Sequence, residues 1–563
     1  MSDASLSYVH GLGRAPLIGE PIGRFFDRTV ATRPNGDALI ARHQGIRWTW
    51  TELRARVDAM AAGLVETGLK RGDRVAIWAQ NRAEWLVTQF ACAKAGLVLV
   101  NINPAARPGE LRDYLNVVGA RALVLQDRFK TSDYIAMAQE VLPELTHSRP
   151  GALHSAAIPS LECVIRLGDG RTDGMFHFDD VLELGSDEAH ARLAAIGAQI
   201  QFDEPCNIQF SSATGDVPAG ATLSHHNILN NGFTVGETLH LGQADRVCIP
   251  VPLFHCFGMV MGNMACLAHG ATIVYPDDTF APDTTLSAIA EERCSACYGV
   301  PAMFIGMLEH EDFARYDLSG LRTGVMAGAP CPIETMRQVV SDMHMEQVTI
   351  AYGMTETSPV SFMCDIDDSV ERRVSTVGTI RPYVEAKVID ADGQIVPRDT
   401  PGELCVRGYN VMLGYWGDDA RTNEVIDLAG WMHTGDLARL DAEGYCNIVG
   451  GVKDVVIRGG ENISPAEVEA FLADHEAIAE VIVVGVPDPR MGEELCACVR
   501  LEPGHSLDTD GLRAFCKDRI SHYKIPRYLR IYDRFPGSSG RALRYMLREE
   551  SVADLGLEEA GSA

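Results

Sequence analysis

Short apolar runs alternate with longer amphipathic stretches through the first two thirds of the chain. Beyond residue 73, helical stretches such as EWLVTQFACAKAG and GELRDYLNVVGA separate the runs RVAIWA, LVLVNIN and RALVLQ. The alternation returns at RVCIPVP (246–252), ATIVYP (271–276), LRTGVMAG (321–328) and QVTIAYG (347–353). Apolar strands between amphipathic helices predict βαβ units around a mostly parallel sheet, and therefore an α/β fold. Residues 144–200 follow neither period and are interpreted as connecting structure.

The pattern changes after about residue 384. The runs VEAKVID, ADGQIVP, GELCVRG and GYCNIVGG alternate with turn signals, which predicts a smaller antiparallel or barrel-like unit. A helix is expected to begin at Ser464-Pro465, with serine as N-cap and proline at the first helical position. The helices and strands that follow predict a compact α/β unit of about 100 residues. We therefore expect two domains, 1–452 and 453–563.

Charge and composition narrow the class of partner. The 563 residues include 49 basic and 77 acidic side chains, a net charge of −28, which disfavours nucleic acid and anionic membrane surfaces. The N-terminal stretch lacks the features of a signal peptide, and no apolar run reaches the length of a membrane span. The 15 cysteines lie at irregular intervals, as in proteins of a reducing compartment. Cys294 and Cys297 form a CxxC without a second ligand pair, so no metal role is expected there. Together these features predict a cytoplasmic enzyme of small-molecule chemistry.

Six stretches in the second half of the chain carry a family resemblance. They are PLFHCFGMVMGN (252–263), GVPAMFI (299–305), MAGAPCP (326–332), YGMTETSP (352–359), WMHTGD (431–436) and VIRGGENISPAEVE (456–469). In this order they resemble the ANL superfamily of acyl-CoA synthetases, adenylation domains and luciferases. The resemblance implies two α/β subdomains plus a β-barrel-like subdomain, followed by a small mobile C-terminal domain with its hinge near Lys453. In that family a carboxylate reacts with Mg-ATP to give an acyl-adenylate, and CoA then displaces AMP.

The resemblance assigns an AMP site. The turn Gly328-Ala329-Pro330 and the residues Ala351, Tyr352, Gly353 and Met354 would form the adenine slot. Thr355 would donate to the α-phosphate, and Glu356 would hold Mg²⁺. Asp436 lies in a Thr-Gly-Asp turn, where a carboxylate can accept from both ribose hydroxyls. AMP or an acyl-adenylate is therefore expected to bind.

The acyl and CoA sites are assigned in the same way. His255, Phe257, Met259 and Gly353 would line the acyl pocket, with His255 as a gate near the carbonyl, although methionine and phenylalanine at such spacing are more often plain core. Gly459, Gly460 and Glu461, with His255, would approach the pantetheine of CoA, because glycine pairs allow close backbone approach. The expected catalytic set is His255, Thr355, Glu356 and Gly459.

Departures from the family pattern all concern adenylation. Members usually read Tyr-Thr-Ser-Gly-Thr-Thr-Gly-x-Pro-Lys-Gly in the phosphate loop, whereas FSSATGDVPAG has Ala213, Gly215, Asp216 and Ala219 at four of these positions. The family's adenylation lysine follows a Thr-Gly pair near the C-terminus, but no lysine follows Lys524 here, and Arg541 or Ala542 takes its place. The usual Gly-Arg-x-Lys-Asp also lacks its arginine, which is Gly451. Lost cations near a triphosphate weaken its binding and slow its reaction.

The sequence-based hypothesis is a non-adenylating acyl-CoA ligase. It would convert a preformed acyl-adenylate and CoA to acyl-CoA and AMP without needing Mg²⁺, and a separate enzyme would supply the adenylate. Ligases of this kind occur in diterpenoid antibiotic pathways such as that of platensimycin, which this chain resembles. Two alternatives stay open: a complete ATP-dependent synthetase in which Arg541 replaces the lysine, and a nucleotide-binding pseudoenzyme. A homodimer is an open possibility.

Overall fold

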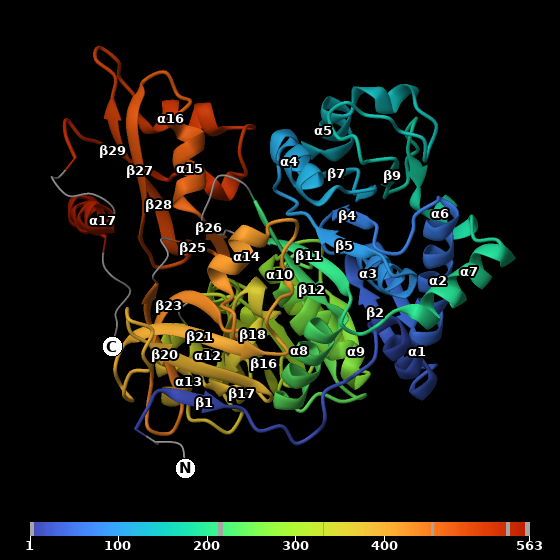
Figure 1. Cartoon of the computed structure of the whole chain (residues 1–563). Coiled ribbons are helices and arrows are strands. Elements are labelled where there is room, and N and C mark those ends of the chain that lie inside the picture. Colours follow the sequence, from blue (N-terminus) through green and yellow to red (C-terminus); the bar gives the residue numbers. More distant parts are fainter. Residues whose placement is uncertain (1–4, 212–217, 330, 452–454, 536–540, 558–563) are drawn as a thin grey trace.

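The chain folds into two α/β sheets, an antiparallel sheet and a C-terminal α/β unit (Figure 1). The computed structural model describes residues 5–211, 218–329, 331–451, 455–535 and 541–557; at 451, 541 and 542 it describes the backbone alone. The predicted α/β architecture is confirmed, and the parts follow one another in the expected order. The expected hinge at Lys453 lies outside the described residues.

The first sheet has eight strands in the order β10-β9-β6-β4-β5-β11-β12-β22. Its central strands β6, β4, β5 and β11 pair in parallel, as their near-continuous apolar sequences predict. One face packs against α2 and α3, and the other against α4 and α5. The bounds are α2 (Trp50–Glu66), β4 (Arg74–Trp78), α3 (Ala83–Ala95), β5 (Val98–Asn101), α4 (Pro108–Val118), β6 (Ala122–Leu125), α5 (Tyr134–Val141), β11 (Pro205–Ser211), β12 (Ala219–Ser224) and β22 (Gly414–Tyr415).

The second sheet has nine strands in the order β19-β18-β17-β16-β15-β13-β14-β2-β3. The six strands from β17 to β2 run parallel, and antiparallel strands close both edges. The bounds are β2 (Asp37–Ala41), β3 (Ile46–Thr49), β13 (Arg246–Cys248), β14 (Thr272–Tyr275), β15 (Ala296–Gly299), β16 (Thr323–Ala327), β17 (Gln347–Gly353), β18 (Val360–Met363) and β19 (Thr379–Ile380). Helices α1 (Ile22–Thr32), α8 (His225–Thr238) and α9 (Ala265–His269) share one core with α2 and α3, so this core lies between the two sheets. Helices α10 (Pro282–Glu292), α11 (Pro301–Leu308), α12 (Ile333–Asp342) and α13 (Val370–Ser375) cover the other face.

The antiparallel sheet has five strands in the order β1-β20-β21-β23-β24, and every neighbouring pair is antiparallel. The bounds are β1 (Tyr8–His10), β20 (Val384–Ile389), β21 (Gly402–Gly408), β23 (Met432–Leu440) and β24 (Cys446–Gly451). The unit after about residue 384 is thus confirmed as antiparallel. The expected strand in ADGQIVP is wrong, because this stretch forms a turn with only isolated bridges, Ile389 to Ile395 and Leu6 to Pro397. The N-terminal strand β1 was not predicted; three residues give no readable period.

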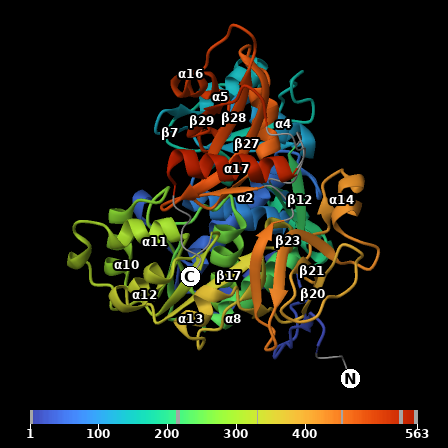
Figure 2. The ribbon, with the colours of Figure 1, turned by 90° about the vertical axis from the view of Figure 1, so that its left-hand side faces the viewer.

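The C-terminal unit is a five-stranded sheet with helices on its faces. The bounds are β25 (Val456–Arg458), β26 (Glu461–Ile463), α15 (Pro465–Leu472), β27 (Ile478–Asp488), β28 (Gly492–Leu501), α16 (Thr509–Cys516), β29 (Tyr528–Ile531) and α17 (Arg541–Leu555). Figure 2 shows α17 lying across β27 and β28. Ser464 is the N-cap and Pro465 occupies the first helical position, both as predicted, although the Ser464 side chain makes no capping hydrogen bond.

The segment 144–200 contains more regular structure than its pattern indicates. Strands β9 (Cys163–Arg166) and β10 (Phe176–His177) extend the first sheet, and helices α6 (Phe178–Glu183) and α7 (Asp187–Gln199) follow. In α7 only Ala189 and Leu193 are buried, so a thirteen-residue helix shows almost no apolar face in its sequence. Among the described residues, no helix is long and apolar enough to span a membrane.

Candidate active site

The expected nucleotide residues gather at the carboxyl ends of two parallel strands. Gly328 and Ala329 follow β16, Tyr352 and Gly353 end β17, and the short helix η5 (Thr355–Thr357) comes directly after them. Loops at this edge of a parallel sheet are where ligands bind in α/β folds. The structure therefore brings together the residues that the motifs placed in one site.

Tyr352 and Asp436 form the closest contact in this group. The phenol of Tyr352 donates to Oδ2 of Asp436 over 2.5 Å, and the backbone N–H of Asp436 donates to Thr434 Oγ1 over 3.1 Å. Burial, together with the charge of Asp436, raises the pKa of Tyr352 well above its usual value, so the phenol keeps its proton. The carboxylate that is expected to accept hydrogen bonds from the ribose hydroxyls is thus held in one orientation.

Gly353 is required by the local backbone. A Cβ at this position would lie 1.7 Å from the carbonyl oxygen of Pro359. The same oxygen accepts from the N–H of Met354 over 3.1 Å and from Thr357 Oγ1 over 2.5 Å. The turn that presents Thr355 and Glu356 is therefore fixed by backbone contacts and needs no ligand to explain its glycine.

Glu356 is buried, with 4% of its surface exposed, and is held by two donors from other elements. Its Oε1 accepts from Ser211 Oγ over 2.6 Å and from Tyr415 OH over 2.9 Å. Burial and the charge of Glu356 raise the pKa of Tyr415, which therefore stays a donor. Mg²⁺ is usually bound by one or two carboxylates plus substrate phosphates, so a single fixed carboxylate beside the start of the phosphate loop fits the expected ion. Sequence reasoning missed both donors; Ser211 stands at a hydroxyl position of the loop motif, but Tyr415 gave no signal.

His255 lies just before a π-helix, η3 (Phe257–Met264). Its Nδ1 accepts from the backbone N–H of Phe257 over 3.1 Å, and burial lowers the pKa of His255 to about 4, so the ring is neutral. Phe257 stacks on Tyr298 with ring centroids 6.0 Å apart, and the fully buried Met259 receives a weak contact from Asn101 Nδ2 at 3.6 Å. Both residues belong to the core between the sheets, which fits the alternative reading as plain core. Their role in an acyl pocket stays a prediction.

The expected CoA loop lies against the nucleotide turn. Gly459 and Gly460, with φ of 60° and 91°, form the turn between β25 and β26. A Cβ on Gly460 would lie 2.8 Å from Val300 Cγ1, and a Cβ on Gly328 would lie 3.9 Å from the Cα of Gly460. The C-terminal unit thus presents its glycine pair directly to the AMP-facing turn.

Glu461 follows the glycine pair and is enclosed by both parts of the chain. Burial raises the pKa of Glu461 to about 7, although the charge of Lys524 and a hydrogen bond from Asn103 act in the opposite direction. The acid therefore titrates near neutral pH. None of these neighbours could be foreseen from the motif.

An ion-pair cluster around Lys524 joins the two parts of the chain. Lys524 Nζ donates to Glu110 Oε1 and to Glu467 Oε1, each over 2.6 Å. Ser521 Oγ also donates to Glu110 over 2.8 Å. Burial alone would lower the pKa of Lys524, but the neighbouring tyrosines and carboxylates raise it well above its usual value. The last lysine of the chain is therefore engaged in this clamp and is charged.

The altered phosphate loop is described only in part. Ala213, Gly215, Asp216, Pro330 and Lys453 lie outside the described residues. Ala219, at the lysine position of the family motif, is the first residue of β12, is 3% exposed and pairs with Ser211. Arg541 and Ala542 begin α17. Among these altered positions, the structure describes the side chain of Ala219 alone, which is a buried methyl group.

The matches to known families cover both parts of the chain. Residues 26–416 match the family described as AMP-binding enzyme, and residues 467–539 match the AMP-binding enzyme C-terminal domain. The fold and site thus define an α/β enzyme of the ANL type, with a large N-terminal and a small C-terminal part. The chain belongs to the AMP-binding enzyme family and is an enzyme of the acyl-CoA ligase type.

Two curated relatives match over nearly the whole chain. The medium-chain acyl-CoA ligase ACSF2, mitochondrial, of Macaca fascicularis is 43% identical over 98% of this chain and 90% of its own length. The putative acyl-CoA synthetase YngI of Bacillus subtilis (strain 168) is 43% identical over 96% of this chain and 98% of its own length. Neither name refers to antibiotic pathways, so the narrower resemblance to the platensimycin-type ligases is not supported.

Solved structures confirm the fold. An o-succinylbenzoate CoA synthetase (MenE) of Bacillus subtilis, bound with its product analogue, is 24% identical with a TM-score of 0.77, covering 94% of this chain and 99% of that chain. ATP-bound MatB of Rhodopseudomonas palustris is 27% identical with a TM-score of 0.65, also covering 94% and 99%. Both cover the N-terminal and C-terminal parts together.

Proposed function

We propose that this chain joins a medium-chain acyl group to CoA through an acyl-adenylate and releases AMP. The observation that carries the proposal is the contact between the Gly459-Gly460 turn and the Gly328 turn. The contact supports the proposal because the glycine pair of the C-terminal unit lies beside the turn that would hold the nucleotide together with Tyr352 and Asp436. The name of the ACSF2 relative supports a medium-chain acyl group.

The transfer of the acyl group to CoA requires no side chain to act as a covalent nucleophile. The sulfur of CoA attacks the acyl carbon, the new C–S bond forms, the C–O bond to the phosphate breaks, and AMP leaves with that electron pair. Asp436 and Tyr352 hold the leaving nucleotide, while the neutral His255 can stand near the carbonyl without adding charge. The thiol proton passes to solvent. Positioning therefore accounts for most of the catalysis.

For the source of the adenylate, the relatives favour the complete ATP-dependent reaction. Both are named as ligase or synthetase, and the identity of 43% extends through both parts of the chain. In that case Glu356 would hold Mg²⁺, which supplies charge neutralisation at the phosphates when bound. Arg541 would then stand in for the adenylation lysine.

A second candidate keeps only the transfer from acyl-adenylate to CoA. One observation favours it: Ala219 and the lysine-free C-terminus remove two cations that would meet the triphosphate and the carboxylate. Removing one preorganised donor typically costs about 3–4 kcal/mol in the transition state. Under this candidate a separate enzyme supplies the adenylate.

A basic pocket beside the CoA loop supports binding of the phosphates of CoA. It measures about 500 Å³, and its titratable lining residues are Arg458, Glu494, Arg513, Lys517, His522 and Arg527. Arg458 is adjacent to Gly459 in the chain. Arg458 and Arg527 already pair with Glu494, so Arg513 and Lys517 are the cations that would attract phosphates there, in a chain of net charge −28.

One experiment with two arms tests the proposal. Purified protein is given a medium-chain acid with ATP and CoA, or the corresponding acyl-AMP with CoA, and thioester and pyrophosphate are measured. Thioester in both arms supports the complete synthetase, whereas thioester from acyl-AMP alone supports the second candidate. Thioester in neither arm, with AMP still bound, would overturn the ligase proposal and leave the nucleotide-binding protein. A cytoplasmic location stays a prediction.

A further inference from the structure

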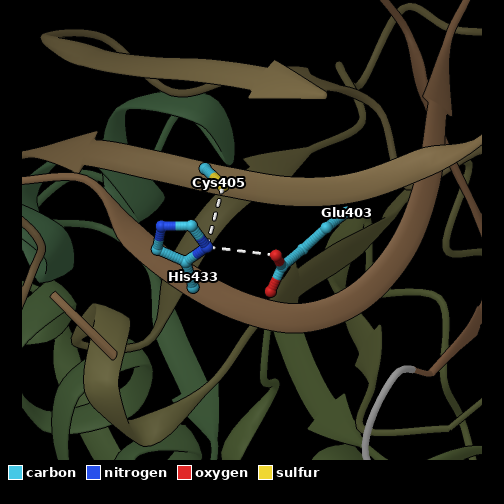
Figure 3. Close-up of side chains that lie close together, drawn as sticks. All are labelled: Glu403, Cys405 and His433. Atoms are coloured by element: carbon cyan, nitrogen blue, oxygen red, sulfur yellow. Dashed lines mark hydrogen bonds and ion pairs between the residues drawn. The ribbon is translucent and has the colours of Figure 1, made fainter. Parts of the chain in front are cut away.

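Three side chains of different chemistry meet on the antiparallel sheet, away from the nucleotide site. Cys405 on β21 pairs directly with His433 on β23, and Glu403 precedes Cys405 by two residues on the same strand. Residues two apart on a strand point to the same face, so the three side chains share it. Figure 3 shows the carboxylate, the thiol and the imidazole converging on one point. Among the described residues, this is the one group of its kind compact enough to hold a metal ion.

The distances fit the edges of a metal coordination tetrahedron. His433 Nδ1 lies 3.0 Å from Glu403 Oε2 and 3.6 Å from Cys405 Sγ, and all three ligand atoms lie within 4.8 Å of one another. Around zinc, bonds of about 2.3 Å to sulfur and about 2.0–2.1 Å to nitrogen or oxygen give ligand separations of roughly 3.3–3.6 Å. The separation between Glu403 Oε2 and His433 Nδ1 would need to lengthen by a few tenths of an ångström to match.

One hydrogen at Nδ1 of His433 cannot serve Glu403 and Cys405 equally. Both Glu403 and Cys405 address the same ring atom, Nδ1 of His433. If Nδ1 carries a proton, it donates to the carboxylate and leaves the thiol hydrogen without an acceptor there. If Nδ1 is bare, the thiol can donate to it, but the carboxylate then faces a lone pair. A cation in place of that one hydrogen would satisfy all three groups at once.

The surroundings leave room for an ion and do not supply a competing cation. Cys405 is fully buried, whereas the side chains of Glu403 and His433 are 27% and 32% exposed, which gives solvent access. Lys387, opposite Cys405 on β20, stacks on Trp431 with its Nζ 4.5 Å from the ring centroid. Arg407 pairs with Glu385 over 2.8 Å. Both neighbouring cations thus have other partners, although the charge of Lys387 also acts on Cys405.

We propose that Glu403, Cys405 and His433 form a binding site for a divalent transition-metal ion of the zinc class, with water as the fourth ligand. Thiolate, imidazole and carboxylate are ligands of such ions, whereas Mg²⁺ prefers oxygen alone. On binding, the S–H bond of Cys405 breaks, the metal–sulfur bond forms, and the proton passes to water. The site joins β21 to β23 three residues before Asp436, so the ion would brace the strand that carries the nucleotide aspartate.

Cobalt titration of the metal-free full chain tests the site. We expect one equivalent of Co²⁺ to produce a thiolate charge-transfer band and a tetrahedral visible spectrum. The band should disappear in Cys405→Ser and persist in Cys446→Ser, a control that replaces another buried cysteine of the same sheet. No band in the unchanged protein, or a band that survives Cys405→Ser, would mean that the cluster is a hydrogen-bonded group only.

Two further variants keep the test decisive if Cys405→Ser folds poorly. Glu403→Gln and His433→Asn alter partly exposed side chains. Replacing a residue that only hydrogen-bonds to a metal ligand already weakens metal binding by about tenfold or more, so we expect the loss of a ligand to weaken Co²⁺ binding by more than about tenfold. Zinc should raise the Tm of the unchanged protein and of Cys446→Ser, but not of Glu403→Gln or His433→Asn. Equal affinity and equal Tm shifts in all four proteins would overturn the proposal. These readouts do not depend on ligase activity.

Discussion

The nucleoside end of the proposed active site keeps its expected binding side chains, whereas the phosphate end lacks the lysines that the family motifs have. At the nucleoside end, the phenol of Tyr352 donates to Asp436 and fixes the carboxylate that is expected to bind the ribose. At the phosphate end, Ala219 presents a methyl group, and no lysine follows Lys524 in the chain. Holding the adenylate and making it are therefore separable properties of one fold, and the two ends can be altered independently.

The largest effect is expected at the nucleoside end. Asp436→Ala removes the carboxylate that would accept from the ribose, and bonds to a charged group contribute about 1.5–3 kcal/mol each. AMP affinity and thioester formation from acyl-AMP should both fall by about 100-fold. Calorimetry with AMP and a thioester assay measure the two quantities. Tyr352→Phe keeps the ring but loses the hydrogen bond to Asp436, so its loss of AMP affinity should be smaller. Unchanged AMP affinity in Asp436→Ala would contradict a nucleoside site at Asp436.

The CoA loop should respond without any change in AMP binding. In Gly460→Ala the new Cβ meets Val300, so thioester formation from acyl-AMP should fall by about tenfold or more. Gly504→Ala is the matched control, because Gly504 has a similar φ of 83° against 91° but no atom within 4 Å of its added Cβ. Equal losses in the two variants would show backbone strain alone.

The phosphate end should gain activity when a cation is restored. Ala219→Lys combined with Asp216→Gly should increase pyrophosphate release from acid and ATP by about tenfold, because a cation then faces the triphosphate. Ala219→Gln with the same second change adds length without charge and should give no gain. A gain in neither variant would show that this loop does not limit the use of ATP.

The smallest effect concerns pH. The pKa of Glu461 is about 7 in the folded chain against an ordinary value of 4.5, so its protonated form is favoured by folding. Its contribution to stability is full below about pH 4.5 and is lost as the pH rises through about 7. The Tm of the unchanged protein should therefore fall between pH 5 and pH 8 more than that of Glu461→Gln. Parallel Tm curves for the two proteins would contradict the burial of this acid.

Sequence motifs predicted the positions of Tyr352 and Gly460 because one motif ends strand β17 and the other forms the turn between β25 and β26. Asp436 lies within β23, beside shifts in its pairing with β21 and β24, and not in the turn that its motif predicted. The supporting contacts were not predicted, because Tyr415 meets Glu356, and Glu110 meets Lys524, only through the pairing of distant segments. The pairing of Cys405 with His433 likewise depends on a register shift in β23, which no local pattern records.

The ion pairs of Lys524 affect the free energy of separating the C-terminal unit from the N-terminal part. Glu467 belongs to the same C-terminal unit as Lys524, whereas Glu110 belongs to the N-terminal part. If the C-terminal unit rotates as the family resemblance implies, Lys524 parts from Glu110 but retains Glu467. The cation would therefore keep one carboxylate partner, while the pairs Lys524–Glu110, Arg107–Asp518 and Arg490–Glu309 would open. Because the retained Glu467 keeps Lys524 paired, such a rotation would not leave a buried cation without a counter-charge.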